Sequence, residues 1–133
     1  MQDGHARTAI LVVDDDRLLR RLVVETLREE GLATVGVGGA LDALELLEAS
    51  PDMALLVTDI NMPGMDGLEL LALTRARRPD LELMVISGRP HLYVDQVPAR
   101  TEFLAKPFTA RQIVARVRGA LEWAAGLPVA GGR

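Results

Sequence analysis

The sequence predicts a doubly wound α/β fold, in which helices cover both faces of an open parallel sheet. Three observations lead to this prediction. Short apolar runs alternate along the chain with segments of helical spacing, which is typical of repeated β-α units. Most of these runs are apolar at nearly every position, as expected for strands buried on both faces. There are five of them, whereas a closed barrel of the same class needs eight.

The predicted strands are short and end in polar residues. The run TAILVV, for example, is followed at once by three acidic residues, which marks the end of the strand. Five parallel strands fit a flavodoxin-like sheet, whose strand order is 2-1-3-4-5. The predicted strands cover residues 8–13, 33–37, 53–58, 81–87 and 101–105.

Four amphipathic segments are predicted to form the helices. Gly31 ends the first of them, and Asp16 and Thr109 stand where the first and the last need an N-cap. Leucine residues at helical spacing predict the buried faces of the first two helices. These leucines are Leu18, Leu22 and Leu27 in the first helix and Leu41, Leu44 and Leu47 in the second. The predicted helices cover residues 17–31, 39–50, 67–78 and 109–126.

One β-α unit is defective. The segment between Ser87 and Thr101 should contain the crossover helix from the fourth strand to the fifth. It contains Pro90 and Pro98 and has no amphipathic helical period. We therefore expect the fourth helix of the fold to be short, distorted or absent.

Composition limits the kinds of site that the chain can form. Its 133 residues are the length of one domain, which we place at 8–125, between an N-terminal extension (1–7) and a flexible tail (126–133). There is no cysteine, which excludes disulfides, thiolate zinc sites and thiol nucleophiles. No apolar run is long enough for a membrane span, and the N-terminus lacks the pattern of a secretory signal. The net charge is −4, without an evident basic face. We expect a cytoplasmic protein with neither membrane insertion nor direct nucleic-acid binding.

Polar residues cluster at the carboxyl ends of the predicted strands, where ligands collect in open α/β sheets. Asp14 and Asp15 follow the first strand, Asp59 ends the third, Ser87 ends the fourth and Lys106 follows the fifth. Carboxylates brought together there would repel one another, and a hard divalent cation such as Mg²⁺ would relieve the repulsion. Taken singly, each of these residues also has an ordinary structural explanation. The acids could be solvated turn residues or helix caps, the serine a turn residue and the lysine a surface residue.

Asp59 could serve as a metal ligand only, or also as a nucleophile. A carboxylate can accept a phosphoryl group and form an acyl phosphate. The metal and the Lys106 ammonium would then neutralise the charge of the transferring group, and the Ser87 hydroxyl could donate to one of its oxygens. The turn that follows Asp59, MPGM, bends the chain away and leaves the carboxylate open to a phosphodonor.

Taken together, the segments ILVVDDD, LLVTDINMPGMDG, VIS and FLAKPF resemble the receiver domain of two-component response regulators. The resemblance covers residues 8 to 124. It implies that Asp59 accepts a phosphoryl group from a histidine kinase or a histidine phosphotransfer protein. It also implies that Asp14, Asp15, Asp59 and the backbone carbonyl of Asn61 hold Mg²⁺.

The resemblance further implies a conformational switch that acts on a downstream protein partner. The Lys106 ammonium would pair with the phosphoryl group and the Ser87 hydroxyl would donate to it, while the Phe103 ring turns inward. Phe103 stands where many members of the family have tyrosine, so this ring can pack but cannot donate a hydrogen bond. The Lys106–Pro107 peptide bond is expected to be cis. The face formed by the fourth helix, fifth strand and fifth helix would meet partners, including a second copy in a homodimer, and we expect the defective fourth helix to give this surface an unusual shape.

Several alternatives remain open at this point. The chain is expected to be a stand-alone receiver, the alternative being a receiver from a hybrid histidine kinase or a larger regulator. We expect no enzymatic turnover of external substrates, only its own phosphorylation and slow autodephosphorylation. A phosphatase with an aspartate nucleophile usually has a second acid two residues later, where this chain has Asn61. A degenerate receiver that only binds a partner is the third reading.

Overall fold

The computed structural model describes residues 9–124, which form one five-stranded parallel sheet with strand order β2-β1-β3-β4-β5. The predicted fold and strand order are therefore confirmed. Each strand begins and ends within a residue of its predicted position. The strands are β1 (Ala9–Val13), β2 (Thr34–Val37), β3 (Met53–Asp59), β4 (Glu82–Ser87) and β5 (Thr101–Ala105).

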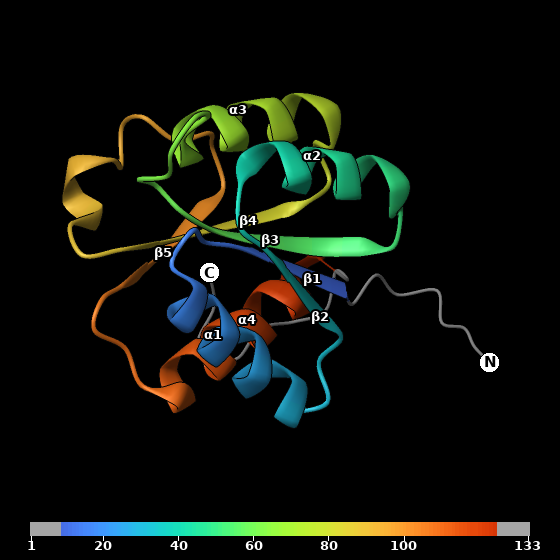
Figure 1. Cartoon of the computed structure of the whole chain (residues 1–133), viewed down its shortest axis with the longest axis vertical. Helices are drawn as coiled ribbons and strands as arrows, with labels where there is room; N and C mark the ends of the chain where they lie inside the picture. The colour runs from blue at the N-terminus through green and yellow to red at the C-terminus, as the bar shows by residue number, and fades with distance from the viewer. Residues whose placement is uncertain (1–8, 125–133) are drawn as a thin grey trace.

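Helices cover both faces of the sheet, as Figure 1 shows. Helices α2 (Ala40–Ala49) and α3 (Gly67–Arg77) lie on one face, and α1 (Arg17–Glu29) and α4 (Ala110–Ala124) lie on the other. Two clusters of buried apolar side chains, one on each face, form the core. The central strands β1, β3 and β4 contribute alternate residues to the two clusters, which explains why their sequences are almost continuously apolar.

The predicted caps of the first and last helices are confirmed. The Asp16 carboxylate accepts hydrogen bonds from the amides of Leu18 and Leu19. The Thr109 hydroxyl accepts from the Gln112 amide, while the Gln112 side chain accepts from the Thr109 amide in return. This reciprocal pair satisfies two backbone donors at the start of α4.

The predicted buried faces of α1 and α2 are partly wrong. Leu18, Leu22 and Leu41 are 80%, 60% and 72% exposed, and on α1 the residues that enter the core with Leu27 are Val23 and Val24. The leucine spacing in α1 also matches a helical period, but the stripe through Val23 and Leu27 faces the sheet instead. Leu18 and Leu22 lie in the first half of α1, which begins two residues after Asp15.

The fourth helix of the fold is reduced to a single 3₁₀ turn, η1 (Pro90–Leu92), as the two prolines predicted. Further turns carry the chain on to Arg100, which has a left-handed φ of 67°. Tyr93 and Val97 pack against the core from this segment, whereas Leu92 and Val94 are exposed. The last helix, α4, is therefore the one that a complete fold of this type would count as its fifth.

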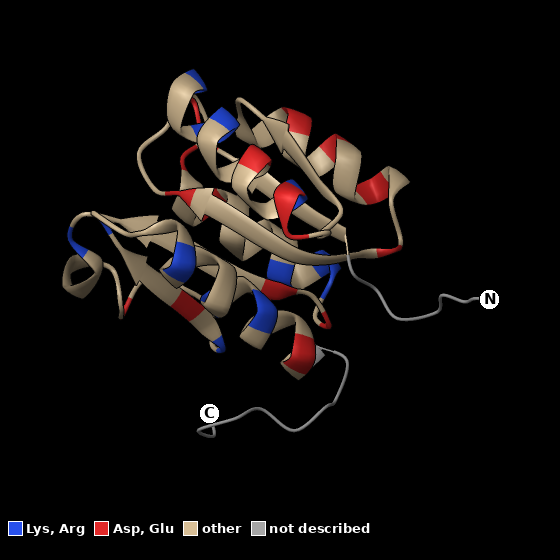
Figure 2. Cartoon of the chain, turned by 90° about the horizontal axis from the view of Figure 1, so that it is seen from below, with Lys and Arg blue, Asp and Glu red and all other residues tan. Residues whose placement is uncertain are grey.

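Acidic and basic residues are interspersed along both helical layers, as Figure 2 shows. Within residues 9–124, no helix is long and apolar enough to cross a bilayer. The predicted N-terminal extension (1–7) and tail (126–133) lie outside the described residues.

Candidate phosphoryl-acceptor and metal site

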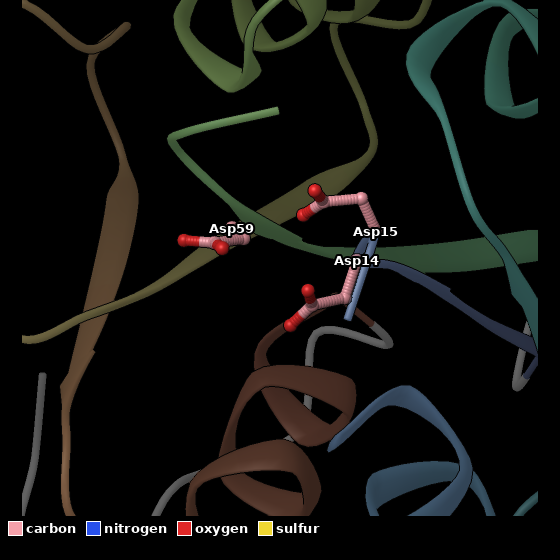
Figure 3. Close-up of side chains that lie close together, drawn as sticks. All are labelled: Asp14, Asp15 and Asp59. Carbon is pink, nitrogen blue, oxygen red and sulfur yellow. The ribbon is translucent and has the colours of Figure 1, made fainter. Parts of the chain in front are cut away.

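Three carboxylates meet at the carboxyl edge of the sheet. Asp14 and Asp15 follow β1, and Asp59 is the last residue of β3, the neighbouring strand. One carboxylate oxygen of each residue lies within 4.8 Å of those of the other two. Figure 3 shows the three side chains gathered around a common space. The structure thus brings together the three acids that the sequence placed at strand ends.

Asp14 is the most enclosed of the three acids. Its side chain is 4% exposed, and its Oδ1 accepts a hydrogen bond of 2.9 Å from the Asp16 amide. Burial raises the pKa of the Asp14 carboxyl above its ordinary value, and the neighbouring charges of Asp59 and Asp15 act in the same direction. The hydrogen bond from Asp16 and the Lys106 ammonium oppose this rise in pKa. A bound cation would favour the charged form of this carboxyl.

Asp59 lies near both the other acids and a lysine. Its Oδ1 accepts a hydrogen bond of 2.8 Å from the amide of Ile60, which fixes the rotation of the carboxylate. Its Oδ2 lies 3.9 Å from Nζ of Lys106, and its side chain is 16% exposed. Asp59 therefore has one oxygen tied to the backbone and the other near a cation, while part of the carboxylate stays accessible.

Parallel pairing brings Ser87 and Lys106 to the same edge. Ser87 is paired in register with Ala105, and the Lys106 amide donates to the Ser87 carbonyl over 2.9 Å. The Ser87 hydroxyl accepts a hydrogen bond of 3.0 Å from the Arg89 amide. A hydroxyl that accepts in this way keeps its own proton free to donate. The Lys106–Pro107 bond is cis, as expected.

Phe103 and Asn61 were also predicted to belong to the site, Phe103 as part of the switch and Asn61 as a metal ligand. The Phe103 ring is partly buried and packs against the core cluster that also contacts Tyr93 and Val97. Asn61 is exposed in the loop directly after β3, where its carbonyl was predicted to bind a metal. The switching role of Phe103 and the ligand role of Asn61 both stay predictions.

The loop after Asp59 is shaped by residues whose importance the sequence did not reveal. The amide of Gly67 donates to the Ile60 carbonyl over 2.7 Å, and Gly64 has a left-handed φ of 77°. The Asp66 carboxylate accepts from the Glu69 amide and caps α3. The MPGMDG segment is thus a closed turn that leads from β3 into α3. Gly64, Asp66 and Gly67 are the residue types that could have indicated this turn in the sequence.

The donor set fits a small hard cation. All three candidate ligands are carboxylate oxygens, and at least one is well exposed, which would allow bound water to complete the coordination. Among residues 9–124, this is the only group of three His, Asp or Glu side chains close enough to share an ion. Asp14, Asp15 and Asp59 are therefore the residues that could hold Mg²⁺.

Comparisons with known proteins agree with this geometry. The family model described as the response regulator receiver domain matches residues 10–118. The receiver protein CpdR of Brucella abortus is 35% identical over 79% of the chain and 89% of its own length. The receiver domain of NtrX from Brucella abortus superposes with a TM-score of 0.77 at 34% identity, over 85% of the chain and 98% of that domain.

Other relatives are much longer than the matched segment. The C4-dicarboxylate transport transcriptional regulatory protein DctD of Rhizobium meliloti is 36% identical over 88% of the chain, but only 26% of that protein is covered. The chain spans from about a quarter to about half of the length of several such relatives. The transcriptional role in that name describes the whole relative. The expectation that this chain does not bind nucleic acid directly stays a prediction.

Proposed function

Because this chain belongs to the response regulator receiver domain family, we propose that it is a signalling switch in which Asp59 accepts a phosphoryl group from a phosphohistidine. One observation carries the proposal. Asp59 is the residue whose carboxylate lies both beside two further acids and 3.9 Å from the Lys106 ammonium. An ion pair with a structural role alone would gain nothing from two further acids, because their negative charges repel the Asp59 carboxylate that Lys106 neutralises.

The transfer would exchange one phosphorus bond for another. An oxygen of the Asp59 carboxylate attacks the phosphorus, a P–O bond forms, and the P–N bond to the donor imidazole breaks. The departing imidazole takes up a proton and remains on the donor protein. Mg²⁺ held by Asp14, Asp15 and Asp59 would neutralise charge on the transferring group. The Lys106 ammonium, 3.9 Å from Oδ2 of Asp59, supplies a second positive charge.

The same residues favour a switch over a turnover enzyme. Asn61 stands two residues after the nucleophile, where it offers no carboxylate to act as general acid or base. We therefore propose that the chain catalyses its own phosphorylation and a slow autodephosphorylation, without turnover of other phosphoesters. The Ser87 hydroxyl, which retains a free proton, would report the phosphoryl group to the segment that follows β4.

Helix α1 begins at Arg17, two residues after Asp15, so its first turns border the loop that carries two of the three acids. Leu18 and Leu22 stand one turn apart on this helix and are 80% and 60% exposed. We propose that this apolar pair contacts the histidine kinase or phosphotransfer protein that supplies the phosphoryl group. A cytoplasmic setting and a downstream protein partner follow from the same role. We further propose that the receiver acts on its own, the alternative being a receiver within a hybrid kinase or a longer regulator.

The test is phosphorylation by a small phosphodonor. The chain is incubated with acetyl phosphate and Mg²⁺, and the intact mass is measured with and without EDTA. We expect a gain of one phosphoryl group that requires Mg²⁺ and is absent from the Asp59→Asn variant. An equal gain in that variant would overturn the assignment of Asp59. Steady release of phosphate from added phosphomonoesters would favour the phosphatase reading instead.

A further inference from the structure

Arg20 links the backbone of the acid cluster to a neighbouring loop. Its Nη1 donates a hydrogen bond of 2.8 Å to the carbonyl oxygen of Asp14, the most buried of the three acids. Arg20 lies in the first part of α1, and its own amide bonds to the carbonyl of Asp16. The Asp14 amide in turn donates to the Val37 carbonyl at the end of β2. Both backbone groups of Asp14 are therefore bonded to residues outside the loop that joins β1 to α1.

Two glycines provide the space that Arg20 occupies. A Cβ on Gly36 would lie 3.1 Å from Cγ of Arg20, and it would also meet the Val24 side chain. A Cβ on Gly38 would lie 2.9 Å from Nη1, the nitrogen that bonds to Asp14. Within 4 Å, the only non-neighbouring atoms that a Cβ on Gly38 would meet belong to the Arg20 guanidinium. The lack of a side chain at Gly38 therefore leaves room for the Arg20 guanidinium and for no other group.

We propose that Arg20 is a positioning residue that holds the Asp14–Asp15 backbone in the geometry that binds Mg²⁺, and that Gly38 is needed to seat its guanidinium. This inference rests on the proposed function of the acid cluster. Arg20 offers no ligand atom of its own, because a guanidinium only donates hydrogen bonds. It acts through the carbonyl of Asp14, as outer hydrogen-bond partners commonly do around metal ligands.

The physical reason is preorganisation. Two of the three acids lie on consecutive residues that connect β1 to α1, and three carboxylates without a cation repel one another. If the Asp14 carbonyl is released, the loop can relax and spread the carboxylates apart. Mg²⁺ must then reverse that relaxation when it binds, so its dissociation constant rises. Arg20 limits the relaxation before the cation arrives.

Gly38 allows the guanidinium to be displaced without removing its charge. In the Gly38→Ala variant, the new methyl group meets the mobile end of a long side chain, so the fold is retained while the guanidinium moves away. In the Arg20→Ala variant, the same methyl group meets open space. The two substitutions therefore remove one and the same hydrogen bond, and their effects should not add.

The experiment measures Mg²⁺ affinity of the full chain by isothermal titration calorimetry in Arg20→Ala, Gly38→Ala and the double variant. We expect each single variant to raise the dissociation constant at least about tenfold, and the double variant to match Arg20→Ala. In EDTA, NMR amide exchange at Asp14 and Asp16 should be faster in both single variants, which is a readout independent of metal and phosphoryl transfer. Melting temperatures are recorded for every variant.

Two matched controls separate position from charge and from backbone effects. Arg21 lies next to Arg20 but pairs with Glu25 on the exposed side of α1, and a Cβ on Gly39 would meet nothing. Arg21→Ala and Gly39→Ala should leave the dissociation constant within about twofold of the parent. A lower melting temperature in Arg20→Ala with unchanged Mg²⁺ affinity would overturn the inference, as would additive effects in the double variant. If the parent chain itself binds no Mg²⁺, the proposed function fails instead.

Discussion

A Cβ on Gly67 would lie 2.1 Å from the carbonyl oxygen of Asp59, so the start of α3 touches the backbone of the proposed phosphoryl acceptor. The same Cβ would lie 2.8 Å from the Cα of Ile60, and the Gly67 amide donates to the Ile60 carbonyl. These contacts are with backbone atoms, which cannot turn aside as a flexible side chain can. The last glycine of the DINMPGMDG motif is therefore required by packing against β3.

Replacing Gly67 by alanine should destabilise the fold. The methyl group must push apart α3 and the end of β3, and overpacking of this kind costs about 1–3 kcal/mol. Urea denaturation followed by circular dichroism measures the change in the free energy of unfolding. Phosphorylation by acetyl phosphate should also slow, because Asp59 moves with its strand. Gly119→Ala is the matched control, since nothing lies within 4 Å of a Cβ there, and it should stabilise α4 by up to about 1 kcal/mol. Equal stability of the parent and Gly67→Ala would contradict the packing argument.

The raised pKa of Asp14 predicts a pH-dependent stability when no metal is bound. Between the ordinary value of 3.8 and the raised pKa of the folded state, folded chains bind more protons than unfolded ones. The contribution of Asp14 to the free energy of unfolding is therefore complete below pH 3.8 and is lost as the pH rises through the raised pKa. In EDTA at neutral pH, Asp14→Asn should be more stable than the parent, and this difference should shrink as the pH falls through the window.

Magnesium should reverse the order of stability at neutral pH. At a concentration 100 times its dissociation constant, Mg²⁺ should stabilise the parent by about 2.7 kcal/mol, and it should do much less for Asp14→Asn. Chemical denaturation from pH 3 to 8, with and without Mg²⁺, measures both effects. Glu45→Gln, at an exposed position of α2, controls for the loss of one negative charge. An Asp14→Asn variant that is less stable than the parent at every pH in EDTA would refute the role assigned to burial.

The sequence predicted the fold and the meeting of the three acids because both depend on where strands end. Once the topology is known, parallel strands place Asp14, Asp59 and Ser87 at one edge without any detail of packing. The two prolines predicted the reduced fourth helix just as directly, because proline has no backbone donor for a helical hydrogen bond. Leu18 and Leu22 were assigned to the wrong face because α1 carries two apolar stripes, and only contact with the sheet decides between them.

Arg20, Gly38 and Gly67 could not have been found in the same way. Their importance rests on approaches between segments that are distant in sequence, such as the guanidinium of α1 against the loop after β2. A glycine in a sequence signals a turn, but it does not say which atom its missing side chain would meet. Only three-dimensional distances supply that information.

The exposed leucines of α1 should matter for a protein donor and not for a small one. We expect Leu18→Ser and Leu22→Ser each to slow phosphotransfer from the phosphorylated histidine kinase that reacts fastest with the parent. Burying one leucine at an interface contributes about 1.5–3 kcal/mol, so the second-order rate constant should fall about tenfold or more. Both residues are exposed in the free chain, so the free energy of unfolding should change by less than about 0.5 kcal/mol.

The control for this prediction is another exposed leucine on the opposite face. Leu41 lies on α2 and is 72% exposed, and Leu41→Ser should leave transfer from the kinase unchanged. Phosphorylation by acetyl phosphate should be equal in all four proteins. If transfer from the kinase is also equal in all four, the donor approaches by another surface.

The segment after β4 should respond to phosphorylation through the hydrogen bond between Arg89 and Ser87. The Arg89 amide donates to the Ser87 hydroxyl over 3.0 Å, and the residues that follow are held by isolated turns rather than by a regular helix. If the hydroxyl moves to donate to a phosphoryl group, the Arg89 amide loses its acceptor. We expect its hydrogen exchange to accelerate when beryllofluoride and Mg²⁺, which mimic the phosphorylated state, are added.

NMR-detected exchange can test this prediction residue by residue. The Asp59→Asn variant should show no response to beryllofluoride. In Ser87→Ala, the Arg89 amide should exchange quickly from the start and change little on addition of the mimic. Amides within α2, which packs against β1 and α3, serve as an internal reference for global stability. An Arg89 amide that keeps its protection in the mimic would show that Ser87 does not couple the site to this segment.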